Sequence, residues 1–337
     1  MNVEAQEFDK PLGNEQFRVE RPAHVPEEAV VEIDYHLFGG AADPRLKPGM
    51  AYQEAWKEIQ DTDGPDMRWT PFNGGHWIPM KGELINEVLQ NPDRFSSKYI
   101  ALPKEVGELY DFIPLTLDPP EQTPYRAILN PLLSHKVVRP KEAPVRALAV
   151  DLIEGFMDKG ECDYVRDFAN ILPVATFHEL VGLPEEEREE LRELATSGDQ
   201  TKPESIELML QKIEGYLRPH LKRRREEPGT DLFSGLLHSH VGDRPITDDE
   251  AMHMCKQLFV AGFHTTASSM TYAMYQMAKE KWLRDEIASD LPNVRFKVEE
   301  LLRRFAMVSI PRTATCDTTL GGQEIKEGDP ILLPRPA

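Results

Sequence analysis

The longest hydrophobic pattern in the chain runs through residues 247–284. Thr247 and Glu250 form the T-x-x-E capping box that commonly begins a helix. The apolar positions that follow at helical spacing are Ala251, Met254, Cys255, Leu258, Gly262, Met270, Met274 and Met277. No charged residue occurs between Lys256 and Lys279, so we expect one long helix that is buried on most sides.

The middle of this helix has an unusual sequence. Residues 261–266, Ala-Gly-Phe-His-Thr-Thr, place a glycine, an imidazole and two β-branched hydroxyls where a buried helix favours leucine and alanine. Threonine hydroxyls can bond the carbonyl one turn back and loosen the backbone ladder, and Gly262 lets a flat group approach the backbone. Two interpretations stay open: a polar kink satisfied within a helical core, or a functional site.

Shorter patterns with the same period predict further helices. Their expected ranges are residues 48–61, 82–90, 122–132, 141–158, 167–181, 184–196, 203–226 and 294–305. Helices therefore account for most of the predicted structure.

Strand signals are confined to two regions. Runs that begin at Met67 and Gly75 predict two strands joined by a turn at Asn73-Gly74. Residues 319–333 alternate and turn like a small sheet, residues 95–120 read as a loop, and residues 1–30 are expected to be extended. The sequence predicts a mainly α fold with a minor β region, in a single domain over residues 1–337.

Composition restricts the compartment and the partners. The formal net charge of -19 argues against binding to nucleic acid or to anionic membranes. The 3 cysteines are widely spaced and offer no zinc-site spacing, which indicates a reducing compartment. The polar residues of the long helix exclude a membrane span. The amino terminus lacks a signal pattern, so we expect a cytoplasmic protein.

Three motifs occur in a specific order. Glu300 and Arg303 form an E-x-x-R on a predicted helix, a pair that alone is typical of a surface salt bridge. It follows the A-G-x-x-T-T helix and precedes Pro311-Arg312. This ordered set resembles the cytochrome P450 monooxygenases. Matching stretches begin at Asn73, Arg94, Tyr110, Asp118, Gly182, Pro228 and Glu299, and they look most like the bacterial, camphor-hydroxylase-like branch.

The resemblance implies haem b as cofactor and assigns roles to individual residues. Thr265 matches the threonine that assists oxygen activation, and His264 stands where the family usually carries an acid, which puts the usual carboxylate relay in doubt. Arg126 and Arg312 match arginines that pair with haem propionates, with Gly262 at the cofactor face. Glu300 and Arg303 would form the family's buried structural ion pair.

The resemblance also implies an apolar substrate pocket with a few polar groups. Its expected lining residues are Tyr110, Leu115, Gln257, Val260, Phe263 and Val308. The phenol of Tyr110 could hydrogen-bond a ketone, or Tyr110 could be a core tyrosine with a satisfied hydroxyl.

The family's haem-ligating cysteine has no match in this chain. It lies in an F-x-x-G-x-x-x-C-x-G loop, and none of Cys162, Cys255 and Cys316 has that context. We therefore expect a C-terminally truncated, incomplete domain whose cysteine ligand lies beyond residue 337, with no metal ligand of its own. Such a chain should be inactive alone and should expose apolar surface of its long helix.

Three functions remain as hypotheses. The first is haem-thiolate hydroxylation of a small apolar, terpenoid-like substrate with O2 and electrons from NAD(P)H, delivered by a reductase and an iron–sulfur ferredoxin. The second is a non-catalytic helical binding protein or decayed P450 paralogue. The third, a haem sensor ligated by His264, is less favoured because no proximal ligand is apparent.

Overall fold

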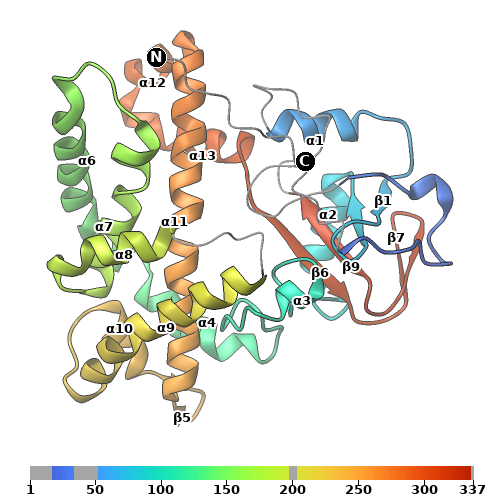
Figure 1. Cartoon of the computed structure of the whole chain (residues 1–337), viewed down its shortest axis with the longest axis horizontal. Coiled ribbons are helices and arrows are strands. Elements are labelled where there is room, and N and C mark those ends of the chain that lie inside the picture. The colour runs from blue at the N-terminus through green and yellow to red at the C-terminus, as the bar shows by residue number, and fades with distance from the viewer. Residues whose placement is uncertain (1–16, 34–51, 197–202, 335–337) are drawn as a thin grey trace. The chain divides into compact units, whose positions relative to one another are not determined.

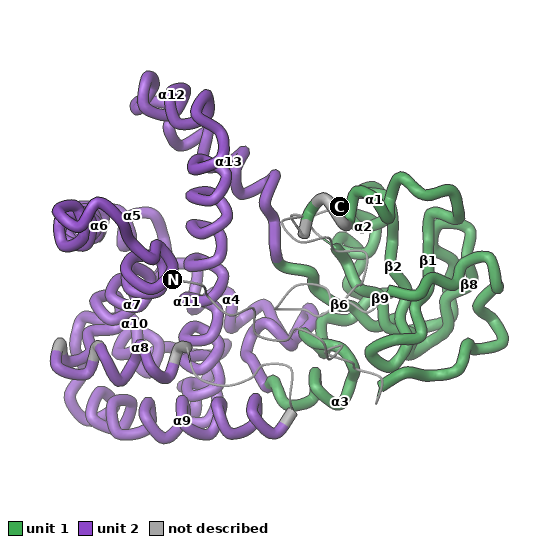
Figure 2. The backbone as a smooth tube through the Cα atoms, turned by 45° about the horizontal axis from the view of Figure 1, so that its top comes forward, with its two compact units in different colours: residues 1–110, 308–337 green, residues 111–307 purple. Residues whose placement is uncertain are grey.

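A computed structural model describes residues 17–33, 52–196 and 203–334 (Figure 1). The chain forms two compact units, unit 1 (Met1–Tyr110 with Val308–Ala337) and unit 2 (Asp111–Met307), which Figure 2 distinguishes by colour. Helices dominate and strands are few, as the sequence predicts. The expectations for residues 1–16 and 48–51 lie outside the described residues. None of the helices within the described ranges is both long and apolar enough to span a bilayer.

Unit 1 is built on one mixed sheet. Its strands are β1 (Met67–Thr70), β2 (His76–Pro79), β3 (Phe95–Ser96), β6 (Ser309–Ala314) and β9 (Pro330–Pro334). They lie in the order β1-β2-β9-β6-β3, with β2 and β9 parallel and the other pairs antiparallel. The last strand, β9, is therefore the centre of the sheet.

Two tight turns join adjacent strands of unit 1. Asn73 (φ 53°) and Gly74 (φ 82°) both have positive φ, as expected for the Asn-Gly hairpin between β1 and β2. Gly321 and Gly322 (φ 54° and 80°) form the two-residue turn between β7 (Thr318–Leu320) and β8 (Gln323–Ile325). Both predicted β regions are confirmed.

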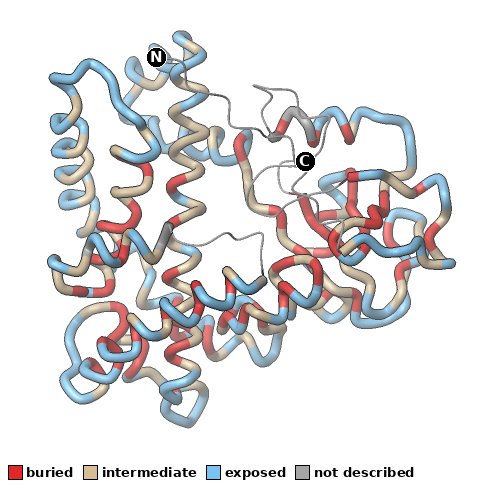
Figure 3. Tube along the Cα trace, viewed as in Figure 1, coloured by how far each residue is buried: buried red, intermediate tan, exposed pale blue. Residues whose placement is uncertain are grey.

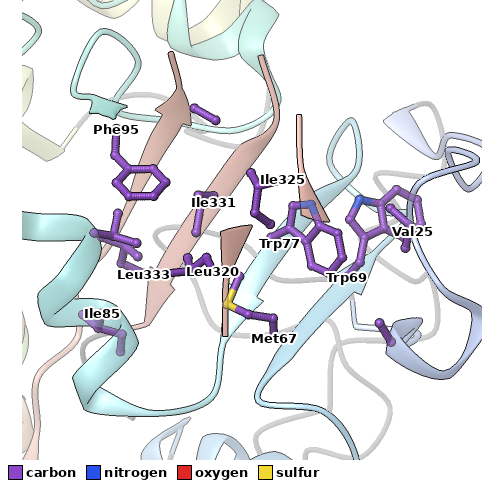
Figure 4. Packing of buried hydrophobic residues seen from close by; sticks show 13 residues of the cluster. Val25, Met67, Trp69, Trp77, Ile85, Phe95, Leu320, Ile325, Ile331 and Leu333 are labelled. Atoms are coloured by element: carbon purple, nitrogen blue, oxygen red, sulfur yellow. The ribbon is translucent and has the colours of Figure 1, made fainter. Parts of the chain in front are cut away.

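The two faces of the sheet carry separate cores because side chains alternate along a strand. Figure 4 shows one core, in which Trp69 and Trp77 pair across β1 and β2 beside Ile331. On the other face, Ile78 and Leu332 pack with Trp56. The helices of this unit are α1 (Tyr52–Gln60), α2 (Gly82–Gln90) and α3 (Lys104–Gly107).

The described amino-terminal stretch of unit 1 runs beside β1. Val31 N–H donates to the carbonyl of Trp69 at 2.8 Å, and Val19 N–H donates to that of Pro71 at 2.9 Å. Residues 17–33 are mostly extended, as predicted, with one 3-10 turn, η2 (Glu27–Ala29).

Unit 2 is helical apart from a two-strand hairpin. Its helices are α4 (Gln122–Leu132), α5 (His135–Val138), α6 (Glu142–Met157), α7 (Leu172–Val181), α8 (Arg188–Thr196), α9 (Pro203–Glu226), α10 (Leu232–Leu237), α11 (Asp248–Lys279), α12 (Lys281–Ser289) and α13 (Val294–Arg304), and its hairpin is β4 (His240–Val241) with β5 (Arg244–Pro245). A π-turn, η4 (Val165–Ala169), precedes α7, so the helix predicted over 167–181 is divided.

The long helix α11 begins as predicted and ends earlier than predicted. Its capping box is complete, since Thr247 N–H donates to Glu250 at 2.8 Å and Glu250 N–H donates to the Thr247 hydroxyl at 3.2 Å. The helix stops at Lys279 because Glu280 is extended (φ -112°, ψ 98°). Arg284 donates to the carbonyls of Met277 and Ala278, which satisfies the open helix end.

Only the first half of α11 is buried. The expectation of a helix buried on most sides is therefore wrong, whereas the expectation that the chain exposes apolar surface of this helix agrees with the structure. Its buried residues are Ala251, Met252, Met254, Cys255, Phe259, Phe263 and Ala267. Beyond Ala267 the side chains are partly or fully exposed, and Figure 3 shows this change along the helix. Helices α7, α8, α9 and α10 contact α11.

Candidate functional site

The α11 midpoint is a regular helix despite its unusual sequence. Thr265 Oγ1 donates to the carbonyl of Ala261 at 2.8 Å, and Ser269 repeats the pattern toward Thr265 at 2.8 Å. This back-bonding was expected from the sequence. It satisfies the hydroxyls while the helix runs without interruption from Asp248 to Lys279.

One face of this midpoint belongs to the core. Phe177 of α7 contacts the rings of Phe259 and Phe263, with centroids 5.9 and 5.1 Å away, and Phe233 completes the aromatic cluster at 6.1 Å. A Cβ added to Gly262 would lie 3.5 Å from the Phe177 ring, an ordinary contact. Gly262 therefore faces α7, and Phe263 is a core residue of this cluster.

The opposite face of the midpoint is open. Gln257, Ala261 and Thr265 follow one another at i, i+4 spacing. Ala261 is exposed, whereas Thr265 and His264 are half-buried. Gln257 Oε1 is enclosed without a hydrogen-bond partner among the described residues. Small and polar side chains thus gather on this face of α11, with Val260 at its margin.

Arg126 is exposed on α4, beside the buried Tyr125. Its guanidinium has no ion-pair partner in the described part of the chain. Tyr125 donates to Glu250 of α11 at 2.5 Å. Hydrogen bonds from Arg244 are the main reason that the pKa of Glu250 lies well below its usual range. Sequence reasoning identified Glu250 as a cap but missed its contact with Tyr125, for which the sequence contains no local signal.

The E-x-x-R pair is formed, but in a different environment from the expected one. Arg303 donates twice to Glu300, with both nitrogen–oxygen distances at 2.7 Å. The side chains are 69% and 63% exposed, so the expectation of a buried pair is wrong for this structure. Both residues lie on α13.

The other predicted pocket and cofactor residues are divided between the units. In unit 1, Tyr110 is buried, and burial raises the pKa of its phenol to about 12. Val308 and Arg312 are half-buried in the same unit, and Arg312 lies on β6 opposite Ile331. Leu115 belongs to unit 2 and is 43% exposed.

The cysteines do not form a metal site. All three are free thiols; Cys162 and Cys316 are exposed and Cys255 is buried. Burial raises the pKa of the Cys255 thiol, so that the thiolate is disfavoured. Within the described ranges, no three His, Cys, Asp or Glu side chains gather in a way that could bind a metal ion.

Comparison with known proteins identifies the family. A model described as cytochrome P450 matches residues 203–336. Probable cytochrome P450 127A1 from Sinorhizobium fredii is 28% identical over 318 residues, 93% of this chain and 76% of that protein. Cytochrome P450(MEG) from Priestia megaterium is 30% identical over 275 residues, 76% of this chain and 67% of that protein.

Solved structures agree with the sequence comparison. The crystal structure of CYP101J2 superposes with a TM-score of 0.84 at 37% identity, covering 94% of this chain and 78% of that chain. This likeness confirms the fold that the ordered motifs predict. The chain therefore belongs to the cytochrome P450 family of haem-containing monooxygenases.

Proposed function

We propose that this chain binds haem b and contributes to the hydroxylation of a small apolar, terpenoid-like substrate in the cytoplasm. In this proposal O2 is the oxidant, and an iron–sulfur ferredoxin with its NAD(P)H-dependent reductase supplies two electrons. The observation that supports it is the open face of α11, on which Ala261 and Thr265 leave small side chains beside the half-buried His264. Family membership supplies the reaction class.

The residues of unit 2 fit a flat, dianionic cofactor. The open face of α11 offers small side chains at Ala261 and Thr265. On α4, the guanidinium of Arg126, which has no ion-pair partner among the described residues, is a planar donor group suited to a propionate. When bound, haem would supply the oxygen-activating iron.

Thr265 and His264 would handle protons at this face. The Thr265 hydroxyl has one donor and two acceptor positions, and its donor now satisfies the Ala261 carbonyl at 2.8 Å. Rotation of the Thr265 hydroxyl would let it donate a hydrogen bond to a group on the open face of α11. An ordered water would then donate to the Ala261 carbonyl in its place. The neighbouring imidazole of His264 can accept and release a proton. Gln257, whose Oε1 is enclosed and unpartnered in the described chain, is the polar group that we assign to substrate orientation.

We propose that none of the three cysteines is the haem ligand, because Cys255 is buried as a thiol and the other two are exposed. The carbon monoxide difference spectrum of the chain with added haemin tests this assignment. We expect no thiolate-type Soret band. Such a band would show that one of the cysteines ligates the iron and that the assignment is wrong.

The monooxygenase proposal is tested with the enzyme in its haem-bound form. With 18O2, NADH, ferredoxin and reductase, one 18O atom should enter the hydroxylated terpenoid. Thr265→Ala should divert about tenfold more reducing equivalents to peroxide, because a positioned proton donor is removed. Thr266→Ala, which changes an exposed neighbour, is the matched control. Equal peroxide yields from the two variants would contradict the role of Thr265.

A further inference from the structure

Helix α4 is fixed to unit 2 by one face and exposes Arg126 on another. Tyr125, Ile128 and Leu129 are buried at i, i+3 and i+4 spacing. Arg126 follows Tyr125 directly, so its side chain leaves the helix about 100° away from the buried phenol. The rotation of α4 that buries Tyr125 therefore sets the direction of Arg126.

The Tyr125 hydroxyl donates to the carboxylate of Glu250, which also accepts hydrogen bonds from other groups. It donates to Glu250 Oε1 at 2.5 Å. Glu250 also accepts from Arg244 Nη1 at 2.8 Å and from the backbone N–H of Thr247 at 2.8 Å. Its side chain is only 15% exposed. The same carboxylate thus caps α11 and anchors α4.

The protonation states of this pair favour the hydrogen bond. Arg244 is the main cause that holds the pKa of Glu250 well below its usual range. Burial, followed by the nearby Glu250 carboxylate, raises the pKa of Tyr125. The donor therefore stays protonated and the acceptor stays ionised around neutral pH.

A second contact fixes the other end of α4. The Leu132 side chain packs so closely on Gly235 of α10 that a Cβ there would lie 2.7 Å from Leu132 Cδ2. Arg126 lies between the two anchors, without an ion-pair partner in the chain as described. A guanidinium on a helix fixed at both ends is preorganised for an anion.

We propose that Tyr125 is a positioning residue, which through its hydrogen bond to Glu250 directs Arg126 toward an anionic group of the bound cofactor. This inference rests on the proposed function, because the anion would be a haem propionate. Tyr125 itself touches neither the cofactor nor the substrate in this proposal.

Fluorescence titration of the chain with protoporphyrin IX and with its dimethyl ester isolates the propionate contribution. Arg126→Ala should weaken binding of the free acid about tenfold and leave the ester unchanged, since a charge-assisted hydrogen bond is lost. Tyr125→Phe should weaken binding of the free acid about fivefold, again without affecting the ester. Tyr216→Phe removes a phenol that donates to Glu187 at 2.8 Å, and this control should alter neither affinity.

A double-mutant cycle separates positioning from general destabilisation. If Tyr125 acts through Arg126, Tyr125→Phe should have no further effect on free-acid affinity in an Arg126→Ala background. Additive losses, or an equal loss for the ester, would overturn the inference and leave the proposed function intact. Unaltered affinity in Arg126→Ala, or a wild-type chain that binds neither porphyrin, would instead count against the proposed haem site.

Hydrogen exchange supplies a readout that does not depend on porphyrin. Tyr125→Phe should increase amide exchange across residues 122–132 and leave residues 203–226 unchanged. Unchanged exchange in α4 would also overturn the inference, because the phenol would then not anchor the helix.

Discussion

Acidification should destabilise unit 1 through a single buried histidine. His76 lies on β2 with no exposed surface, and its Nδ1 is 3.2 Å from the carbonyl oxygen of Phe72. Its Nε2 has no hydrogen-bond partner among the described residues. Burial lowers the pKa of the imidazole from 6.5 to about 4, because the cation would be desolvated.

The size of the effect follows from linkage. The unfolded chain binds a proton at His76 below pH 6.5, whereas the folded chain does so only below about pH 4. The contribution of the neutral His76 to the free energy of unfolding is therefore fully present above pH 6.5. It is lost as the pH falls toward 4. A pKa lowered from 6.5 to about 4 corresponds, at about 1.36 kcal/mol for each pH unit, to a loss of about 3 kcal/mol. About 2 kcal/mol of it should be lost by pH 5.

Urea unfolding followed by tryptophan fluorescence measures this loss. Trp56, Trp69 and Trp77 all belong to the cores of unit 1, so their emission reports mainly on this unit. Unfolding free energies at pH 7, 6 and 5 should be compared between the wild type and His76→Phe. The variant keeps an aromatic side chain that cannot be protonated, so its stability should depend less on pH.

The comparison of slopes isolates His76 from the carboxylates that also titrate at low pH. Equal loss of stability between pH 7 and 5 in the two proteins would refute the reasoning. So would an imidazole 15N titration that gives His76 a pKa near 6.5 in the folded chain.

Three further substitutions test individual packing arguments. Phe177→Ala removes the ring that contacts both Phe259 and Phe263, and it should lower the unfolding free energy of unit 2 by about 3–5 kcal/mol. Hydrogen exchange in α7 and α11 measures this loss, and a loss below about 1 kcal/mol would contradict the packing. Gly75→Ala, at φ 76° with a Cβ 2.7 Å from Trp69, should lower the urea midpoint of unit 1 fluorescence, and an unchanged midpoint would show that the turn relaxes. Glu300→Gln should leave the thermal midpoint unchanged, because the pair with Arg303 is exposed; a clear fall would indicate a buried role.

Local sequence signals predicted the elements whose determinants lie within a few residues. The T-x-x-E box of Thr247 and Glu250 and the Asn73-Gly74 turn are both found as predicted. In each case the donors, acceptors or allowed φ values belong to neighbouring residues. The order of the P450 motifs also predicted the fold class correctly, because the order of motifs along the chain can be read from the sequence alone.

Features that depend on distant residues were not predictable in this way. The break at Glu280 contains neither glycine nor proline, and the side chain of Arg284 closes the helix end. Hydrophobic spacing also could not reveal that the second half of α11 is open, because burial depends on which elements pack there. The Tyr125–Glu250 bond joins residues 125 positions apart and has no sequence signature.

The central position of β9 has a consequence for synthesis on the ribosome. Residues 111–307 can emerge and pack as unit 2 while the amino-terminal strands still lack their central neighbour. β1 and β2 can pair as a hairpin at once, yet Trp77 contacts Ile331 only after the last strand leaves the exit tunnel. The three buried tryptophans of the first hundred residues, Trp56, Trp69 and Trp77, therefore lack part of their packing until residues 330–334 have been synthesised.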